Sequence, residues 1–179
     1  AVHALRKACT RMTIVARDPV TAERFQYHNI PNTVQSADLS FLLEPAESIV
    51  LQQQVMDFIQ ESSSRNPLLI GINPHFLQVR TPEGKKRIIA ALHEAVESIF
   101  LHYPNAHFVF LPNDNRRYQQ AINSFEIVDQ LLPLLPTEIQ DRCSSILPKA
   151  GSSREIRRIC SELDVCIAGS FHLAMTCLS

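Results

Sequence analysis

A histidine close to the end of the chain has both the side chain and the position for proton transfer. His172 follows the apolar run 165–168 after only Gly169, Ser170 and Phe171, which places it in the first turn of a helix that begins directly after a strand. The positive end of a helix disfavours imidazolium, so we expect a neutral ring unless an anionic ligand offsets this effect. A partly buried histidine bonded to a backbone carbonyl would fit the same position, and the residues alone leave both interpretations open.

Further polar residues fall where other predicted strands end. The carboxyl ends of the strands of an open parallel sheet meet at one edge, and ligands bind at that edge. Where these residues precede helices, the free N–H groups of the helix favour a phosphate or a carboxylate. Helix capping is the simpler explanation of Asn113 and Asp114, and His75 fits an ordinary surface loop. The candidate ligand-binding residues at this edge are Ser170, Asn113, Asp114, Ser152 and His75.

A second strand end near the start of the chain carries opposite charges. Arg17 and Asp18 follow a β-branched run over residues 12–16. Asp18 is a good N-cap, and Pro19 suits the first position of the helix that follows. The residues alone therefore favour a helix cap with a local ion pair over a ligand site at this point.

The chain has neither a glycine-rich phosphate loop nor a recognisable metal site. Its four glycines leave no room for such a loop, and its five cysteines contain no C-x-x-C pair. The histidines are scattered rather than grouped at the ligand spacing of zinc, so we expect no metal and no cofactor. Cys160, Cys166 and Cys177 fall at apolar positions, which predicts buried free thiols in a reducing compartment.

Composition narrows the class of protein. The 179 residues are 45% hydrophobic and 20% charged, which is typical of a globular chain rather than a disordered or fibrous one. The formal net charge is −1, so the charge balance does not indicate a basic surface for nucleic-acid binding. No apolar run reaches the roughly 18 residues of a membrane span.

The elements that must position the candidate residues alternate between strands and helices. This alternation predicts right-handed crossovers and a parallel sheet, and the continuous apolar strands predict helices on both faces. The expected fold class is therefore α/β, with a Rossmann-like parallel sheet. Strands are predicted over residues 12–16, 33–37, 68–72, 107–111, 145–147 and 165–168, and helices before, between and after them.

One predicted helix has a defined start and a charged face. Ser152 and Glu155 have the spacing of a capping box at its beginning. Arg154, Arg157 and Arg158 lie opposite its apolar stripe, so we expect all three to face solvent.

The order and spacing of these motifs resemble the polysaccharide pyruvyl transferase family over nearly the whole chain. Residues 15–22 are similar to the family's strand that ends in Arg-Asp, and residues 36–43 to its aspartate followed by an apolar triplet. Residues 110–114, 153–167 and 170–172 are similar to successive motifs of its second half.

The resemblance implies a two-domain fold like that of the GT-B glycosyltransferases, with the active site between two Rossmann-like halves. On this basis residues 1–47 are expected to end the N-terminal domain and residues 48–65 to form an inter-domain helix and linker. Residues 66–179 would form most of the C-terminal domain. The chain would then be the middle and C-terminal part of a longer protein.

The resemblance also implies an activity. Members transfer pyruvate as a ketal from phosphoenolpyruvate to a sugar, with release of phosphate, and phosphoenolpyruvate is a substrate rather than a cofactor. The acceptor would be a cell-surface polysaccharide or its lipid-linked or nucleotide-linked precursor, which implies a cytoplasmic protein at the inner face of the membrane. Arg17 would bind the donor's anionic groups and His172 would be the acid/base or a phosphate ligand. Asn113 and Asp114 would line the cleft.

This chain departs from the family pattern at one position that matters for the donor. Many members carry arginine two residues before the histidine, where this chain has Ser170. A serine hydroxyl is a weaker phosphate ligand than a bidentate guanidinium. Two alternatives therefore stand beside the pyruvyl transferase: a GT-B glycosyltransferase that uses a nucleotide sugar, and a non-catalytic domain that binds a glycan or an anion.

Overall fold

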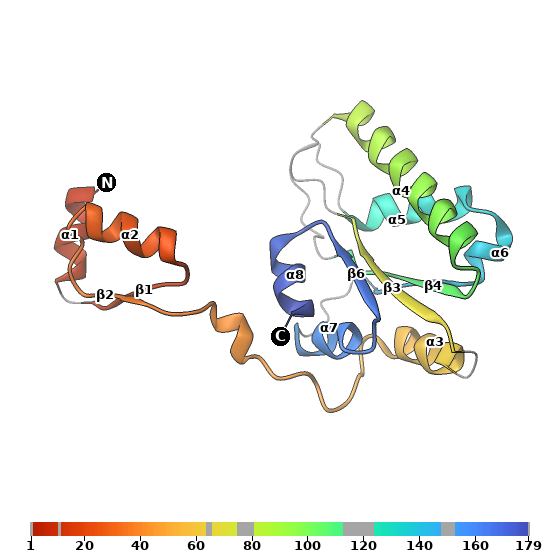
Figure 1. Ribbon diagram of the computed structural model, residues 1–179, viewed down its shortest axis with the longest axis horizontal. Coiled ribbons are helices and arrows are strands. Elements are labelled where there is room, and N and C mark those ends of the chain that lie inside the picture. The colour runs from red at the N-terminus through yellow and green to blue at the C-terminus, as the bar shows by residue number, and fades with distance from the viewer. Residues whose placement is uncertain are drawn as a thin grey trace. The chain divides into compact units, whose positions relative to one another are not determined.

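The computed structural model describes residues 2–10, 12–63, 66–74, 81–112, 124–147 and 153–178. They form two compact units, residues 1–43 and 44–179, each with its own parallel sheet (Figure 1). Parallel strands alternating with helices confirm the predicted Rossmann-like α/β class.

The N-terminal unit is built on a parallel pair of short strands. β1 (Ile14–Ala16) pairs with β2 (Thr33–Gln35), and α2 (Pro19–Tyr27) connects them. Asp18 caps α2 as predicted, because its side chain accepts a hydrogen bond from the Thr21 N–H at 2.8 Å. The unit also contains α1 (Val2–Cys9) and the 3-10 helix η1 (Leu39–Leu42).

The C-terminal unit contains a four-stranded parallel sheet with the strand order β5-β4-β3-β6. The register places Ile70 of the inner strand β3 opposite Phe108 on one side and Val165 on the other. The predicted strands are confirmed, although the short strand β5 begins and ends two residues earlier than expected. The strands are β3 (Leu68–Asn73), β4 (Ala106–Phe110), β5 (Cys143–Ser145) and β6 (Val165–Ala168).

Helices cover both faces of this sheet, as the continuous apolar strands predicted (Figure 1). Successive residues after the start of β4 point to opposite faces: Phe108 and Phe110 enter one core, and Val109 and Leu111 enter the other. The first face is covered by α4 (Pro82–His102), α5 (Ser124–Leu131), η2 (Leu132–Leu134) and α6 (Thr137–Gln140). The second face is covered by α3 (Gln53–Ser63), α7 (Ser153–Cys160) and α8 (Phe171–Cys177). Among the described helices, none combines the length and apolar character needed to cross a bilayer.

The segment that links the units differs from the prediction. The chain divides between Leu43 and Glu44, and the helix expected within the linker 48–65 packs into the C-terminal core. Val55 and Ile59 on α3 are buried there. The apolar stripe of α3 covers one face of the four-stranded sheet, so this helix belongs to the C-terminal unit rather than to a connector.

The residue just before α3 fastens the same segment to the end of β5. Gln52 is completely buried. Its Nε2 donates to the Leu147 carbonyl at 3.4 Å, and its Oε1 accepts from the Leu147 N–H at 2.8 Å. The side chain thereby satisfies both backbone groups of a residue that follows the edge strand.

Candidate functional site

A buried asparagine organises the carboxyl edge of the four-stranded sheet. Asn73 ends β3, and its Nδ2 donates to the Leu111 carbonyl at 2.6 Å. Its Oδ1 accepts from the Ser170 N–H at 3.0 Å, and its backbone carbonyl accepts from Gly169 at 3.1 Å. The segments that follow β4 and β6 are therefore both held at the end of β3.

Ser170 starts the helix that carries the candidate histidine. Its side chain is only 7% exposed, and its Oγ accepts a hydrogen bond from the Leu173 N–H at 3.3 Å. It is thus the N-cap of α8. Because the hydroxyl is buried and engaged in capping, the contact that the structure gives Ser170 is structural, and its binding of a substrate stays a prediction.

His172 lies in the first turn of α8 with its side chain exposed, as expected for a helix directly after β6. Exposure removes the alternative of a partly buried, carbonyl-bonded ring. The imidazole packs edge-on beside the Phe171 ring, with 6.2 Å between ring centroids, and the Thr176 hydroxyl donates to the His172 backbone carbonyl at 2.9 Å. The ring is therefore accessible to a ligand while its backbone is held in the helix.

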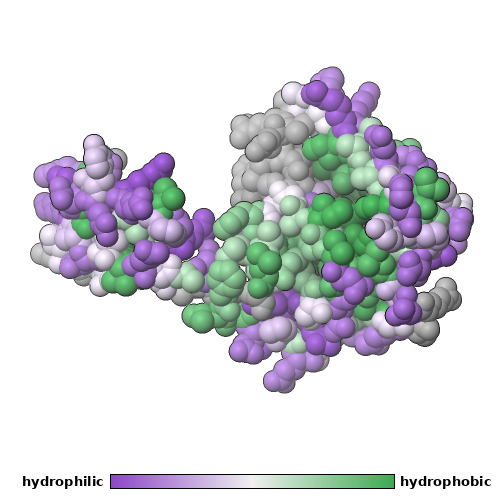
Figure 2. Space-filling view, in the orientation of Figure 1, coloured by the Kyte–Doolittle hydropathy of each residue, from purple (hydrophilic) through white to green (hydrophobic). Residues whose placement is uncertain are grey.

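The surface around this histidine is largely apolar. Val165 and Ile167 on the edge strand β6 are each 46% exposed, and Phe171 is 60% exposed. Figure 2 shows apolar residues gathered over β6 and α8.

Arg17 directly follows β1, the first strand of the N-terminal unit, as predicted. Its Nη1 lies 3.0 Å from Oδ2 of Asp38, the aspartate of the second motif, so this ion pair joins residues 21 positions apart and is not the local pair expected. The Arg17 side chain is 55% exposed against 20% for Asp38, so a ligand can reach the guanidinium. The Thr21 hydroxyl and N–H both donate to Asp18, and these bonds lower the pKa of the Asp18 carboxyl.

The predicted site residues divide between the two units. Arg17 belongs to the N-terminal unit, whereas Ser170 and His172 belong to the C-terminal unit, where Asn73 joins them. His75, Asn113, Asp114 and Ser152 lie outside the described residues. Asn73 begins the stretch 73–75 that the strand-end rule selects, but only His75 of that stretch was named as a candidate ligand.

Some charged residues of α7 are more buried than the sequence predicts. Arg157 is only 3% exposed, so the expectation that it faces solvent is wrong. Glu155 is also buried, and its Oε1 accepts from the N–H groups of Val50 at 2.9 Å and Leu51 at 3.2 Å. The Ser152 half of the predicted capping box lies outside the described residues. Glu155 therefore ties α7 to the segment before α3.

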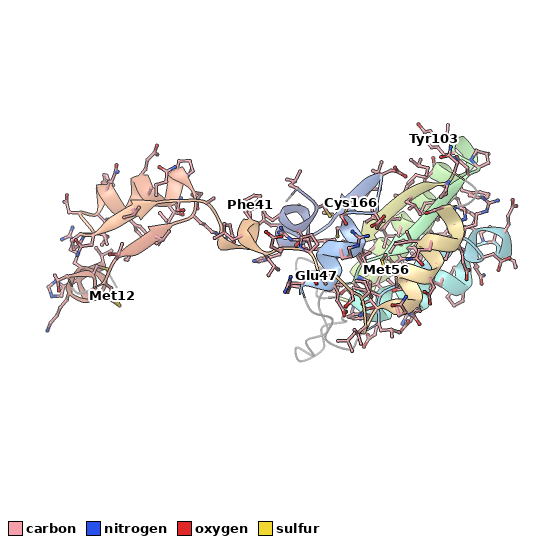
Figure 3. All side chains as sticks on the ribbon, turned by 90° about the horizontal axis from the view of Figure 1, so that it is seen from below. Met12, Phe41, Glu47, Met56, Tyr103 and Cys166 are labelled. Atoms are coloured by element: carbon pink, nitrogen blue, oxygen red, sulfur yellow. The ribbon has the colours of Figure 1, made fainter. Side chains whose placement is uncertain are left out.

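A polar pocket of about 390 Å³ lies beside this contact, within the C-terminal unit. It is lined by Ala46, Glu47, Ser48, Arg154 and Glu155. The Arg154 guanidinium donates to the carbonyls of Glu44 at 3.1 Å and Pro45 at 3.3 Å, which holds one wall of the pocket in place. Glu47 is labelled in Figure 3. Within the described part of the chain, no group of histidine, cysteine and carboxylate side chains is arranged to hold a metal ion.

The similarity of the chain to a known protein family covers both units. The model of the family described as polysaccharide pyruvyl transferase matches residues 1–179. No curated protein matches the chain. The matched range contains all the segments that carry the resemblance, with Arg17 and His172 among their residues.

Proposed function

The chain belongs to the polysaccharide pyruvyl transferase family, and on that premise we propose that it transfers pyruvate as a ketal from phosphoenolpyruvate to a sugar. The family makes the protein a transferase with a sugar or polysaccharide acceptor. The donor, and an acceptor that belongs to a cell-surface polysaccharide or to its lipid-linked or nucleotide-linked precursor, are parts of the proposal.

This reaction sets clear chemical requirements. A proton must reach the methylene carbon of phosphoenolpyruvate, which turns it into a methyl group and leaves the neighbouring carbon electrophilic. Two hydroxyls of one sugar then form C–O bonds to that carbon, the bond to phosphate breaks, and one hydroxyl proton remains on the methyl group while the other leaves with phosphate. The protein must therefore supply an acid/base group and cations for the carboxylate and phosphate.

The observation that carries the proposal is an exposed imidazole on a firmly held backbone. His172 projects from the first turn of α8, and the start of that helix is fixed by the Ser170 cap and by the bond from Ser170 N–H to Asn73. A general acid or base needs an accessible proton at a defined place. We assign His172 this proton transfer, and we assign Ser170 the support of the helix that presents it.

Arg17 is the proposed partner of the donor's negative charge. Its guanidinium is half-exposed and is oriented from one side by the Asp38 carboxylate at 3.0 Å. A planar guanidinium binds carboxylate or phosphate through paired N–H groups. An arginine held in this way loses less side-chain entropy on binding an anion than a fully mobile one.

Replacement of His172 tests the proposal. In the full-length protein, His172→Ala should lower the rate of phosphate release from phosphoenolpyruvate by about 100-fold or more, because general acid–base catalysis contributes that much. Ketal formation on the sugar is followed by mass spectrometry. His93→Ala is the matched control, since His93 lies on α4 and pairs with Glu97 at 3.3 Å. Undiminished activity of His172→Ala would remove His172 from the reaction.

A second candidate function rests on Ser170. The hydroxyl that stands where many relatives carry arginine is buried in a helix cap, which favours a domain that binds a glycan or an anion without catalysis. Calorimetry with phosphoenolpyruvate and with a nucleotide sugar separates the candidates. Binding without turnover of phosphoenolpyruvate would support the second one, and binding of the nucleotide sugar alone would indicate a glycosyltransferase.

A further inference from the structure

Three cysteines lie in one hydrophobic core, and they come from α7, β6 and α8, the helix that carries His172. Cys160 ends α7, Cys166 lies in β6 and Cys177 ends α8, and all three pack in the same hydrophobic core. The Cys177 side chain shares hydrogen bonds with those of Cys160 and Cys166. None is part of a disulfide. Cys166 is labelled in Figure 3, where β6 lies next to α8.

The hydrogen bonds shift the pKa values of the three thiols in different directions. The Cys160 and Cys166 thiols both bond to the Cys177 sulfur, which lowers the pKa of Cys177 to about 4 and raises the pKa of the other two, with burial raising them further. The positive charge of the buried Arg157 lowers the pKa of Cys160 and so offsets a small part of that rise. A sulfur that accepts bonds from two thiols is the one that ionises.

Access also differs within the cluster. Cys160 is only 8% exposed, whereas Cys166 and Cys177 are half-buried. A small oxidant and a reducing thiol can therefore reach Cys166 and Cys177 more easily than Cys160. Thiolate character and access together decide which cysteines are oxidised.

We propose that Cys166 and Cys177 form a reversible disulfide when the protein meets a peroxide. The Cys177 thiolate attacks one oxygen of hydrogen peroxide, the O–O bond breaks, and hydroxide leaves, which yields a sulfenic acid. The Cys166 sulfur then attacks the Cys177 sulfur, the S–O bond breaks, and water leaves as the S–S bond forms. In total, two thiols are oxidised and one peroxide is reduced to two waters. Two thiols of a reductant reverse the change.

The disulfide would fasten the edge strand β6 to the last turn of α8. The loop it closes, residues 166–177, contains both Ser170 and His172. The site is independent of the proposed function, because it rests on the thiol cluster and not on the transfer reaction.

Peptide mapping of the intact protein tests the proposal without any substitution. The reduced full-length protein is treated with hydrogen peroxide, and its remaining thiols are alkylated. No Lys or Arg follows Arg158 before Ser179, so trypsin places all three cysteines in one peptide that begins at Ile159. Cleavage after Glu162 and Asp164 then separates Cys160 from the other two. The expected product carries Cys166 and Cys177 in one fragment that has lost two hydrogen atoms and takes no alkyl group.

Cys143 is the internal control. Its thiol donates to the Ile139 carbonyl at 3.1 Å, and burial raises its pKa to about 12. Cys177 should lose its free thiol at least about tenfold faster than Cys143. Cys177→Ser should abolish the linked fragment, whereas Cys160→Ser should still link Cys166 to Cys177, at a rate that reports the contribution of the Cys160 hydrogen bond. A fragment that links Cys160 to Cys177, or equal rates at Cys177 and Cys143, would overturn the proposal.

Discussion

Asn73 is the residue on which the carboxyl edge of the sheet depends most directly. Asn73→Ala removes the donor to the Leu111 carbonyl and the acceptor for the Ser170 N–H, and it leaves both backbone groups buried. Each such group costs about 1–3 kcal/mol when unsatisfied, so the free energy of unfolding should fall by about 2–6 kcal/mol. Urea unfolding followed by circular dichroism measures this change.

Asn105→Ala is the matched control, because it removes the same side-chain amide from an exposed position. Asn105 is exposed, and its Nδ2 donates to the Asn66 carbonyl at 3.3 Å. Asn105→Ala should change the free energy of unfolding by less than about 0.5 kcal/mol. Equal effects of the two substitutions would show that the bonds of Asn73 do not hold the sheet edge.

Side chains with local partners could be predicted from the sequence, and those with distant partners could not. Asp18 bonds Thr21 within one helical turn, so its cap follows from spacing alone. Arg157 was expected in solvent because it lies opposite the apolar stripe of α7. That helix also contacts α8, and Glu155 bonds Val50 and Leu51 about a hundred residues earlier in the chain. Helical periodicity contains no information on such contacts.

The start of α2 should respond to acid. The hydroxyl and N–H of Thr21 lower the pKa of Asp18 below its ordinary value of 3.8, so the cap stabilises the fold while the carboxyl is ionised. That stability is present above the unfolded pKa and is lost as pH falls through the lowered pKa of the folded state. Asp18→Asn still caps the helix but does not titrate at this position. The melting temperatures of the two proteins should differ more at about pH 6 than at about pH 3. A constant difference would contradict the role of the ionised carboxyl.

The approach of the α7–β6 connection to β3 leaves little space for a side chain at Gly71. A Cβ at Gly71 would lie 2.5 Å from Cδ1 of Leu163 and 3.2 Å from Cδ1 of Leu111. Gly71→Ala should therefore lower the free energy of unfolding by about 1–3 kcal/mol through overpacking. If the clash is with Leu163, Leu163→Ala should cost less in the Gly71→Ala background than in the wild type. A double-mutant cycle in urea measures that coupling, and strict additivity would refute the clash.

Strands and helices with strong apolar patterns were predictable at the element scale. The continuous runs of β3 and β4 predicted a sheet covered on both faces, and both cores are present. The position of α3 was not predictable, because its stripe shows only that one face is buried and does not name the partner. Gln52 illustrates the difficulty, since a polar residue beside a helix is normally exposed but here satisfies the backbone of Leu147.

At the scale of the whole molecule, the sequence and the structure place the division of the chain differently. The polar run 61–67, which begins within the last turn of α3, predicts a boundary there, whereas the chain divides into its two compact units between Leu43 and Glu44. The first three residues of the run, 61–63, form the last turn of α3, and the apolar face of this helix packs into the C-terminal unit. Two truncated chains that begin at residues 44 and 66 distinguish these boundaries.

The chain 44–179 should unfold cooperatively, because both of its cores are formed by its own residues. The chain 66–179 lacks Val55, Met56 and Ile59, which are all buried against the sheet. Burying each such side chain stabilises a fold by about 1.5–3 kcal/mol, and their sum approaches the whole stability of an ordinary domain. The shorter chain also leaves the Glu155 carboxylate without the N–H groups of Val50 and Leu51. We therefore expect a sharp urea transition for 44–179 and none for 66–179, and equally sharp transitions would restore the boundary at residues 61–67.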